Sequence, residues 1–330
     1  MDNNDMGIDL GTVNTLIYTK NKGIALNEPS VIAIDSYSKK VLAVGAEAKR
    51  MLGRTPGTVR AAMPLEDGVI ADFDLTSQML RQFVKKVKHG FGKPNIIISL
   101  PSKVTAVEKR AVEDAAYFAG ARKVYPIEEP LAAAIGANIP IFEANGHAII
   151  DIGGGTTEAA IISLGGLVSV SSVKCGGNQL DRDIISYVKK NYGVLIGETT
   201  AEEIKLNIGN VFYGETVDYM TVSGRDLQQG LPVNIAISSD EVMDALRDSI
   251  NLIVDCFKQV LEKTPPELSS DIYQNGVLLT GGGALLKGWD KLIMQETGII
   301  ANLSEQPFEN VARGAGLSLD MLKALEVARG

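Results

Sequence analysis

Hydrophobic positions along the chain follow two periods, one typical of strands and one typical of helices. The unbroken apolar run Asn95–Leu100 indicates a buried strand. Apolar residues instead recur every three or four positions in Ala106–Ala119, and Thr105 and Gly120 fit the two ends of such a helix. Alternation of strands with helices predicts an α/β fold. The other predicted strands are Val124–Ile127 and Gly276–Thr280, and the other predicted helices are Leu75–Lys88, Pro130–Ala137, Leu180–Tyr192, Thr200–Ile208, Asp240–Lys263 and one from about Val311.

Two predicted hairpins share one pattern of residues. Each leads from an aspartate through glycine and small polar residues into an apolar strand. The two stretches are DLGTVNTLIY at Asp9–Tyr18 and DIGGGTTEAAII at Asp151–Ile162. An apolar strand also precedes each aspartate, and each hairpin begins one half of the chain. We therefore expect two duplicated halves whose hairpin turns face one another across a cleft.

Length and composition are those of an ordinary globular protein. The 330 residues are 45% hydrophobic and 22% charged, enough for about two domains. The net charge of −8 opposes binding to a phosphate backbone, so nucleic acid is not an expected partner. Cys175 and Cys256 match neither a zinc spacing nor a disulfide framework. MDNND does not resemble a signal peptide, and no apolar run approaches the roughly 18 residues of a membrane span, so we expect a cytoplasmic protein.

The glycine-rich turns predict a phosphate site. Glycine has no Cβ, so backbone N–H groups beside it can approach an anion closely. The chain contains neither G-x-x-x-x-G-K-[ST] nor a G-x-G-x-x-G that follows a strand, the other glycine-rich phosphate motifs. Because Asp9 and Asp151 would repel phosphate, we expect Mg²⁺ between the carboxylates and the phosphates. The alternative is that these turns are simply glycine-rich hairpins.

A third glycine cluster, LLTGGGALLKG, lies at Leu278–Gly288. It ends a predicted strand and begins a predicted helix. Its three glycines would allow a flat adenine ring to lie against the backbone. Together with the two hairpin turns, it favours a nucleotide as the ligand.

Four motifs occur in the order found in the ATPase superfamily of actin, heat-shock chaperones and sugar kinases. They are DLGTVNTLIY, IEEPLAAAIG at Ile127–Gly136, DIGGGTTE and LTGGGALLKG. Within this superfamily the chain resembles the MreB family of bacterial actins. Further matches to that family are NEPSVIAID, EDGVIADFD, IGNVF, KTPPELSSDI and VARGAG, so the resemblance extends essentially from end to end.

The resemblance implies an actin-like ATPase fold in which two lobes enclose a cleft for ATP or ADP with Mg²⁺. Each lobe would have a core of a sheet with helices and a smaller insertion. The implied boundaries are 1–32, 66–145 and 313–330 for subdomain IA, 33–65 for subdomain IB, 146–181 and 246–312 for subdomain IIA, and 182–245 for subdomain IIB.

The resemblance also implies which residues form the site. Glu129 would orient or polarise the attacking water, helped by the Thr156 hydroxyl, and its alternative role is that of a helix N-terminal acid. Asp9 and Asp151 would hold Mg²⁺, mainly through water. The implied phosphate contacts are Gly11, Thr12, Asn14, Thr15, Gly153, Gly154, Gly155, Thr156 and Thr157, and the implied nucleoside contacts are Glu202, Lys205, Asn207, Gly281, Gly282, Gly283 and Ala284.

Two positions near the helical motif TAEEIK depart from the family pattern. Glu203 replaces a basic residue, and Asn207 replaces an acid. These departures leave open the contacts to the ribose and the preference between ATP and GTP.

The resemblance implies a homopolymer of protofilaments that pair antiparallel at the inner face of the cell membrane, with membrane shape or wall-synthesis proteins as partners. The candidate membrane contact is KKVKHGFGKP at Lys85–Pro94, with Phe91 at its tip. Lys88 and Lys93 would lie near anionic lipid. The alternative is a helix C-terminus whose lysines face the helix dipole.

These expectations favour a slow, Mg²⁺-dependent ATPase whose filaments maintain or determine cell shape. A small-molecule kinase and a chaperone ATPase on the same fold are the alternatives. Filament formation that responds to nucleotide would distinguish the cell-shape ATPase from the kinase and from the chaperone.

Overall fold

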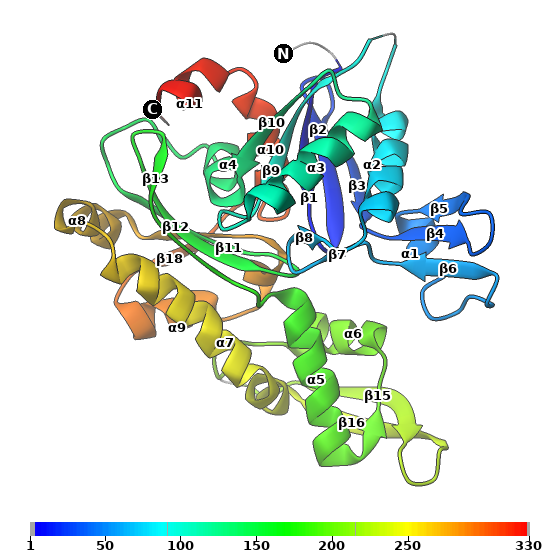
Figure 1. The fold of residues 1–330 in the computed structure, drawn as a ribbon. Coiled ribbons are helices and arrows are strands. Elements are labelled where there is room, and N and C mark those ends of the chain that lie inside the picture. The colour runs from blue at the N-terminus through cyan, green and yellow to red at the C-terminus, as the bar shows by residue number, and fades with distance from the viewer. Residues whose placement is uncertain (1–3, 91, 215, 329–330) are drawn as a thin grey trace.

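The computed structural model describes residues 4–90, 92–214 and 216–328. Within these ranges, the strands form two five-stranded sheets, two three-stranded sheets and one two-stranded ribbon. Figure 1 shows the two large sheets forming the body of the molecule, with the two small sheets projecting from it. The predicted α/β class is confirmed.

The first large sheet contains the N-terminal hairpin. Strands β1 (Met6–Leu10) and β2 (Asn14–Thr19) pair antiparallel, and β3 (Gly23–Pro29) extends them into a meander. On the other side of β1, β9 (Asn95–Leu100) and β10 (Lys123–Glu128) add as parallel strands. The carboxyl ends of β1, β9 and β10 therefore meet at one edge of the sheet.

The second large sheet repeats this arrangement. Strands β11 (His147–Ile152), β12 (Thr157–Ser163) and β13 (Gly166–Val173) form the antiparallel meander. Strands β17 (Val277–Thr280) and β18 (Ala301–Leu303) add parallel to β11, as β9 and β10 add to β1. The predicted duplication, with a hairpin at the start of each half, is confirmed.

Three smaller strand groups connect to these sheets, and the hydrophobic pattern did not predict their strands. Most of them are only two to four residues long, and the two longer ones mix exposed with buried positions, so no long apolar run marks them. Their bounds are β4 Ile32–Asp35, β5 Val41–Val44 and β6 Val59–Ala62 in one sheet, β14 Val194–Leu195, β15 Tyr219–Asp226 and β16 Pro232–Ser238 in the other, and β7 Leu65–Glu66 with β8 Val69–Ile70 in the ribbon.

The helices begin and end close to the predicted positions. A capping box of Thr105 and Glu108 begins α3, and Gly120, with φ 110°, ends it. The helix predicted from about Val311 ends at Ser318, and a separate helix follows it, which corrects the prediction of one closing helix. The helices are α1 Ala46–Lys49, α2 Phe73–Val87, α3 Ala106–Ala119, α4 Glu129–Gly136, α5 Gly177–Tyr192, α6 Glu198–Ile208, α7 Ser239–Glu262, α8 Pro266–Asn275, the 3₁₀ helix η1 Gly282–Leu285, α9 Trp289–Thr297, α10 Asn310–Ser318 and α11 Leu322–Ala328.

Helix α4 lies between the two large sheets and joins their cores. Its apolar residues form one buried cluster with side chains from β9 and β11. Helix α10 crosses α4 so closely that a Cβ on Gly314 would collide with the Ala132 carbonyl, and a Cβ on Gly136 with the Asn310 carbonyl. Glycine is therefore required at this crossing, where two backbones touch.

We predict that Gly314→Ala destabilises the protein, because the added methyl forces α10 away from α4. The expected loss in the free energy of unfolding is about 3 kcal/mol, measured by urea denaturation. Gly57→Ala is the matched control, since a Cβ at Gly57 meets no atom within 4 Å. Equal stability of the two variants would contradict the close crossing.

Candidate functional site

A cavity of about 290 Å³ opens between the two large sheets. Both hairpin turns and the third glycine cluster line it, so it collects segments from the two halves of the chain. The turns face one another across it, as predicted. The sequence-predicted residues that line it are Asp9, Gly11, Thr12, Asn14, Glu129, Asp151, Gly153, Gly154, Gly155, Thr156, Glu202, Lys205, Gly281, Gly282 and Gly283.

Two predicted phosphate contacts lie just outside this lining. The Thr15 hydroxyl is buried and shares a hydrogen bond of 2.9 Å with Ser30. The Thr157 hydroxyl is also buried and donates to the Cys175 carbonyl at 2.7 Å. Both threonines therefore stabilise the strands behind the turns.

Two predicted nucleoside contacts also lie outside the lining. Asn207 is exposed, and its side-chain amide donates back to the Glu203 carbonyl one turn earlier in α6, at 2.7 Å. Ala284 is buried within η1. Helix periodicity explains the first case, because Glu202 and Lys205 face the cavity and Asn207 turns away from it.

The two hairpin turns approach each other through their glycines. A Cβ on Gly154 would collide with the Val13 side chain. A Cβ on Gly155 would lie 2.7 Å from the Thr12 hydroxyl and 3.0 Å from the Asp67 Cα. Side chains at these glycines would push the turns apart, so the glycine run fixes the width of the cleft as well as exposing N–H groups.

The turn between β7 and β8 is a part of the site that the sequence did not reveal. Asp67 and Gly68 both have positive φ, 48° and 79°, which makes the turn tight. The Gly68 N–H donates to the Thr12 hydroxyl at 2.8 Å. A Cβ on Gly68 would lie 3.1 Å from the Thr156 methyl, so the ribbon tip touches both hairpin turns.

Four acids surround the inner end of the cleft. Burial raises the pKa of Asp151 to about 8, and Asp9 and Glu158 add to this by repulsion. Burial likewise raises the pKa of Asp9 to about 6, although the Ser99 hydroxyl donates to it at 3.1 Å. The pKa of Glu129 is raised well above its ordinary value by burial and then by its three acidic neighbours. Glu158, which the sequence did not single out as a site residue, is buried with a raised pKa.

The donor set fits a cation held largely by phosphate and water. Among the residues that the structure describes, no group of three or more acids, histidines or cysteines is arranged to hold a metal ion by itself. Asp9 and Asp151 nevertheless line the same cavity, and their raised pKa values show that negative charge there is poorly compensated. Mg²⁺ commonly binds in this way, through one or two carboxylates with water and phosphate oxygens.

The third glycine cluster holds one wall of the cavity. Gly281 has φ 82°, which favours glycine there. The Trp289 indole N–H donates to the Gly283 carbonyl at 2.9 Å and so fixes the loop from behind. A Cβ on Gly282 would lie 2.7 Å from the Phe308 ring. The loop is therefore open on its cavity side only because its glycines carry no side chains.

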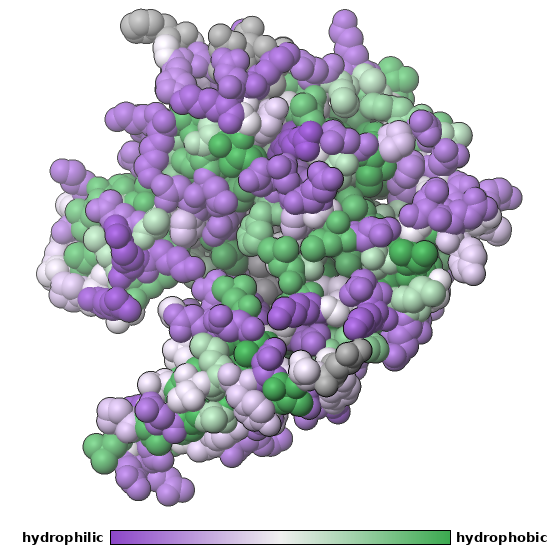
Figure 2. Space-filling model, turned by 180° about the vertical axis from the view of Figure 1, so that it is seen from behind, coloured by the Kyte–Doolittle hydropathy of each residue, from purple (hydrophilic) through white to green (hydrophobic). Residues whose placement is uncertain are grey.

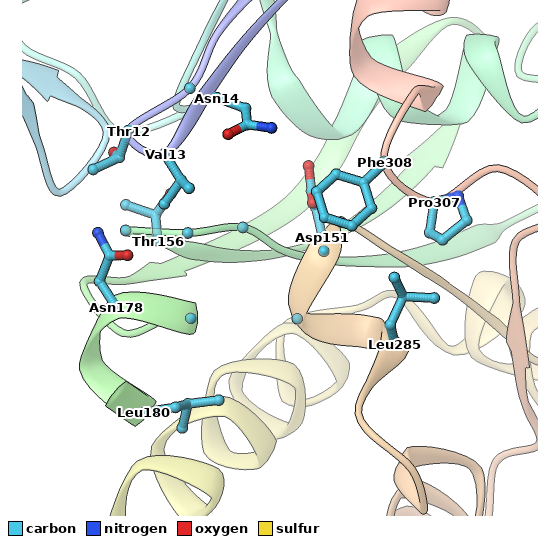
Figure 3. A pocket seen from close by; sticks show the side chains of 18 of the residues that line it. Thr12, Val13, Asn14, Asp151, Thr156, Asn178, Leu180, Leu285, Pro307 and Phe308 are labelled. Carbon is cyan, nitrogen blue, oxygen red and sulfur yellow. The ribbon is translucent and has the colours of Figure 1, made fainter. Parts of the chain in front are cut away.

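The far end of the cavity is apolar. Leu206, Leu285 and Phe308 are 72%, 47% and 46% exposed, and they come from three separate elements to line the same space. Figure 3 shows Phe308, Pro307 and Leu285 grouped together, away from Thr12 and Thr156. Pro307 and Phe308 stand in no glycine motif, and Leu285 only follows the glycines of the third cluster, so the sequence did not identify these three as site residues.

Charged side chains also line the cavity. Lys205 forms an ion pair with Asp181 at 2.8 Å and donates to the Gly177 carbonyl at 2.9 Å. Glu202, on the same helix, pairs with Lys49 of α1 at 3.4 Å. This second ion pair connects the two small sheet units across the cleft.

The predicted membrane contact is placed only in part. Phe91 lies outside the described residues. Lys88 is half-buried just after α2, and Lys93 is exposed. Lys85 and Lys86 occupy the last turn of α2, so they fit the helix dipole, the alternative role considered for this segment.

Comparisons with known proteins agree with this geometry. The family described as MreB/Mbl protein matches residues 3–327. The chain is 50% identical to the cell shape-determining protein Mbl of Bacillus subtilis (strain 168), covering 97% of each chain. It is 51% identical to the cell shape-determining protein MreB of Escherichia coli (strain K12), covering 98% of this chain and 95% of that one.

A solved structure is similar along nearly the whole fold. The crystal structure of MreB 5 of Spiroplasma citri bound to AMPPNP superimposes with a TM-score of 0.91 and 37% identity, covering 96% of each chain. The actin-like fold expected from the sequence motifs is thereby confirmed. On its sequence and its fold, this chain belongs to the MreB/Mbl protein family.

Proposed function

We propose that this protein is an actin-like ATPase whose filaments maintain or determine cell shape. The observation that carries the proposal is a cleft, between two duplicated sheets, in which three glycine turns and several acids converge. Two relatives with about half of their residues identical are named cell shape-determining proteins, and a similar structure holds AMPPNP. These findings support a nucleotide as the ligand and cell shape as the outcome.

The two ends of the cleft favour one orientation of ATP. Its phosphates lie between the hairpin turns, where Gly11, Thr12 and Asn14 face Gly153–Thr156 and glycine leaves backbone N–H groups accessible. The base lies at the apolar end, against Gly281–Gly283 and Phe308. Glu202 and Lys205, which also line the cavity, are the proposed ribose contacts.

Asp9 and Asp151 are the residues that would hold Mg²⁺. They reach the cavity from corresponding strands of the two sheets, so they would face the phosphates from both sides. A bound Mg²⁺ would supply positive charge that offsets both the phosphates and these carboxylates. With the cation between them, each carboxylate would be attracted to Mg²⁺, and this attraction would outweigh their mutual repulsion. Nucleotide and metal would therefore bind together.

Glu129 and Thr156 are the proposed hydrolytic pair. Glu129 begins α4 at the end of β10, and Thr156 precedes β12, so they approach the cavity from different sheets. The Glu129 carboxylate accepts a hydrogen bond from the attacking water, and the Thr156 hydroxyl orients it toward the terminal phosphate. An ionised Glu129 polarises this water more strongly than a protonated one, so its role depends on compensating the charge of the acids around it.

We further propose that the protein assembles with itself into protofilaments that pair antiparallel. Apolar residues are not confined to the interior, and Figure 2 shows them on the surface between polar ones. Tyr219 and Tyr273 are 73% and 72% exposed, and Ile300 is 58% exposed. Single exposed apolar side chains are common on any protein surface, so the proposal of self-assembly rests chiefly on the similarity to the MreB/Mbl family.

The filaments are proposed to lie at the inner face of the cell membrane, with membrane shape or wall-synthesis proteins as partners. No helix in the described part of the chain is both long and apolar enough to cross a membrane. The lysines around Lys85–Lys93 support contact with anionic lipid, since each basic residue near such a surface contributes about 1 kcal/mol.

High-speed sedimentation with Mg-ATP, Mg-ADP or EDTA tests this function when released phosphate is assayed in parallel. We expect pelleting that requires nucleotide, together with slow phosphate release. Protein that stays in the supernatant under all conditions, and forms ADP only when a small-molecule acceptor is added, would instead indicate a kinase.

Glu129→Ala should lower phosphate release by about a hundredfold, because the attacking water loses its hydrogen-bond acceptor. Binding of Mg-ATP should stay within about threefold of the wild type, since Glu129 is not a proposed phosphate or metal ligand. Glu128→Ala is the matched control, because this neighbouring acid does not line the cavity. Wild-type turnover by the Glu129 variant would remove its catalytic assignment.

Asp151→Asn should stabilise the empty protein while weakening its binding of Mg-ATP. Folding raises the pKa of Asp151 from 3.8 to about 8, so between these values the folded state binds the extra proton. The free energy of unfolding therefore falls as pH rises through this window. At pH 8 in EDTA, we expect the variant to exceed the wild type by up to about 5 kcal/mol, with little difference near pH 4.

Urea denaturation at several pH values measures this difference. Asp248→Asn is the control, because it removes the same charge from an exposed position within α7. Parallel pH profiles for the wild type and Asp151→Asn would show that ionisation of Asp151 does not destabilise the fold. Unchanged Mg-ATP affinity would contradict the proposed metal role of Asp151.

A further inference from the structure

One side-chain bridge joins the two large sheets beside the cleft. The Glu158 carboxylate, on β12 of the second sheet, accepts the Ser102 N–H at 2.9 and 3.1 Å. It also accepts the Ser102 hydroxyl at 3.1 Å. Ser102 follows β9 of the first sheet, and Glu158 is 1% exposed, so this is a buried contact between elements far apart in the sequence.

The first-sheet end of the bridge lies next to the proposed hydrolytic acid. Strands β9 and β10 are parallel, and Leu100 pairs with Glu128. Ser102 and Glu129 therefore leave neighbouring strands at the same edge of the sheet. The segment after β9 and the start of α4, which carries Glu129, therefore begin from paired positions on neighbouring strands.

The second-sheet end lies next to the other proposed active groups. Glu158 pairs with Asp151 across the hairpin, and Thr156 lies two residues before it. The Ser172 hydroxyl, from the position opposite Glu158 on β13, also donates to the Glu158 carboxylate. This end of the bridge is therefore held rigidly within the sheet.

Packing places the bridged segment against the turns as well. A Cβ on Gly68 would lie 2.9 Å from the Pro101 ring and 3.1 Å from the Thr156 methyl, so the ribbon tip is wedged between them. The Ser99 hydroxyl donates to Asp9 at 3.1 Å. Residues 99–102 thus contact acids or turns on both sides of the cleft.

Packing alone does not explain a carboxyl at position 158. Burying an acid near Asp151 and Glu129 costs free energy, and the hydrogen bonds to its carboxylate come from two serines, three contacts from Ser102 and a further one from Ser172. An apolar side chain would fill the space without this cost, but it could not bind the Ser102 N–H.

We propose that Glu158 is a positioning residue, which, through Ser102, fixes Glu129 on the first sheet in register with Thr156 on the second. The bridge aligns the water-orienting pair when the sheets close on nucleotide. This inference rests on the proposed ATPase function. It assigns Glu158 no contact with the reacting atoms.

The test compares Glu158→Ala, Glu158→Gln and Ser102→Ala in the full chain. A glutamine oxygen can still accept the Ser102 N–H, whereas alanine cannot. We expect Glu158→Ala to lower the rate of phosphate release by about tenfold or more, with ATP affinity within about threefold, because misplacement affects the transition state. Glu158→Gln should recover most of that rate, and Ser102→Ala should add little in the Glu158→Ala background.

Other outcomes would overturn the proposal. If Glu158→Ala releases phosphate at the wild-type rate, the bridge does not position Glu129 and Thr156 for hydrolysis. Equal loss in Glu158→Ala and Glu158→Gln would assign the effect to charge, and a parallel fall in ATP affinity would assign it to binding. Hydrogen exchange at the Ser102 amide measures the bridge without reference to turnover. This amide should be protected in the wild type and exchange faster in Glu158→Ala, and equal exchange would also contradict the proposal.

Wild-type protein assayed in parallel separates this inference from the proposed function. If the wild type binds ATP but releases no phosphate, even when it is assembled, the ATPase proposal fails and the positioning role fails with it. If only the variants behave differently from the expectation, the ATPase proposal stands and the bridge alone is rejected.

Discussion

The close approach of two backbone turns is the constraint on which the rest of this structure depends. Gly154 and Gly155 leave no room for a side chain against Val13 and Thr12. This contact sets the distance between the two sheets at their strand ends, and therefore the width of the cleft available to the proposed nucleotide. A wider gap would separate Glu129 from Thr156 and detach the ribbon tip from both turns. Backbone geometry thus determines the site before any catalytic side chain is considered.

The same closeness concentrates negative charge. Asp9, Asp151, Glu129 and Glu158 would repel one another less in a looser fold, and water would screen them. Here burial raises all four pKa values, and repulsion by the neighbouring acids adds to the rise for Glu129 and Asp151, so ionising these carboxyls has an electrostatic cost. Ligand binding that compensates this charge would stabilise the whole molecule. Binding in the cleft is therefore coupled to how closely the two sheets approach each other.

Local patterns predicted much of this fold, and contacts between distant segments account for what they missed. The apolar run of β9 and the capping residues of α3 act within a few positions, so the sequence alone located both elements. The hairpin glycines were also evident. The roles of Gly68 and Phe308 depend on neighbours far along the chain, as does the bridge from Ser102 to Glu158. Asn207 illustrates a different limit. Its place on the turn of α6 directs its side chain away from the cavity, where it bonds to the Glu203 carbonyl.

The tryptophan behind the third glycine cluster has a practical consequence. Trp289 is the single tryptophan of the chain, and its indole N–H is bonded to the Gly283 carbonyl. Its ring is buried, so bulk solvent contributes little to its surroundings. Intrinsic fluorescence excited at the indole band therefore reports from one place, the glycine loop that lines one wall of the cleft. The native chain carries its own spectroscopic probe there, with no label required.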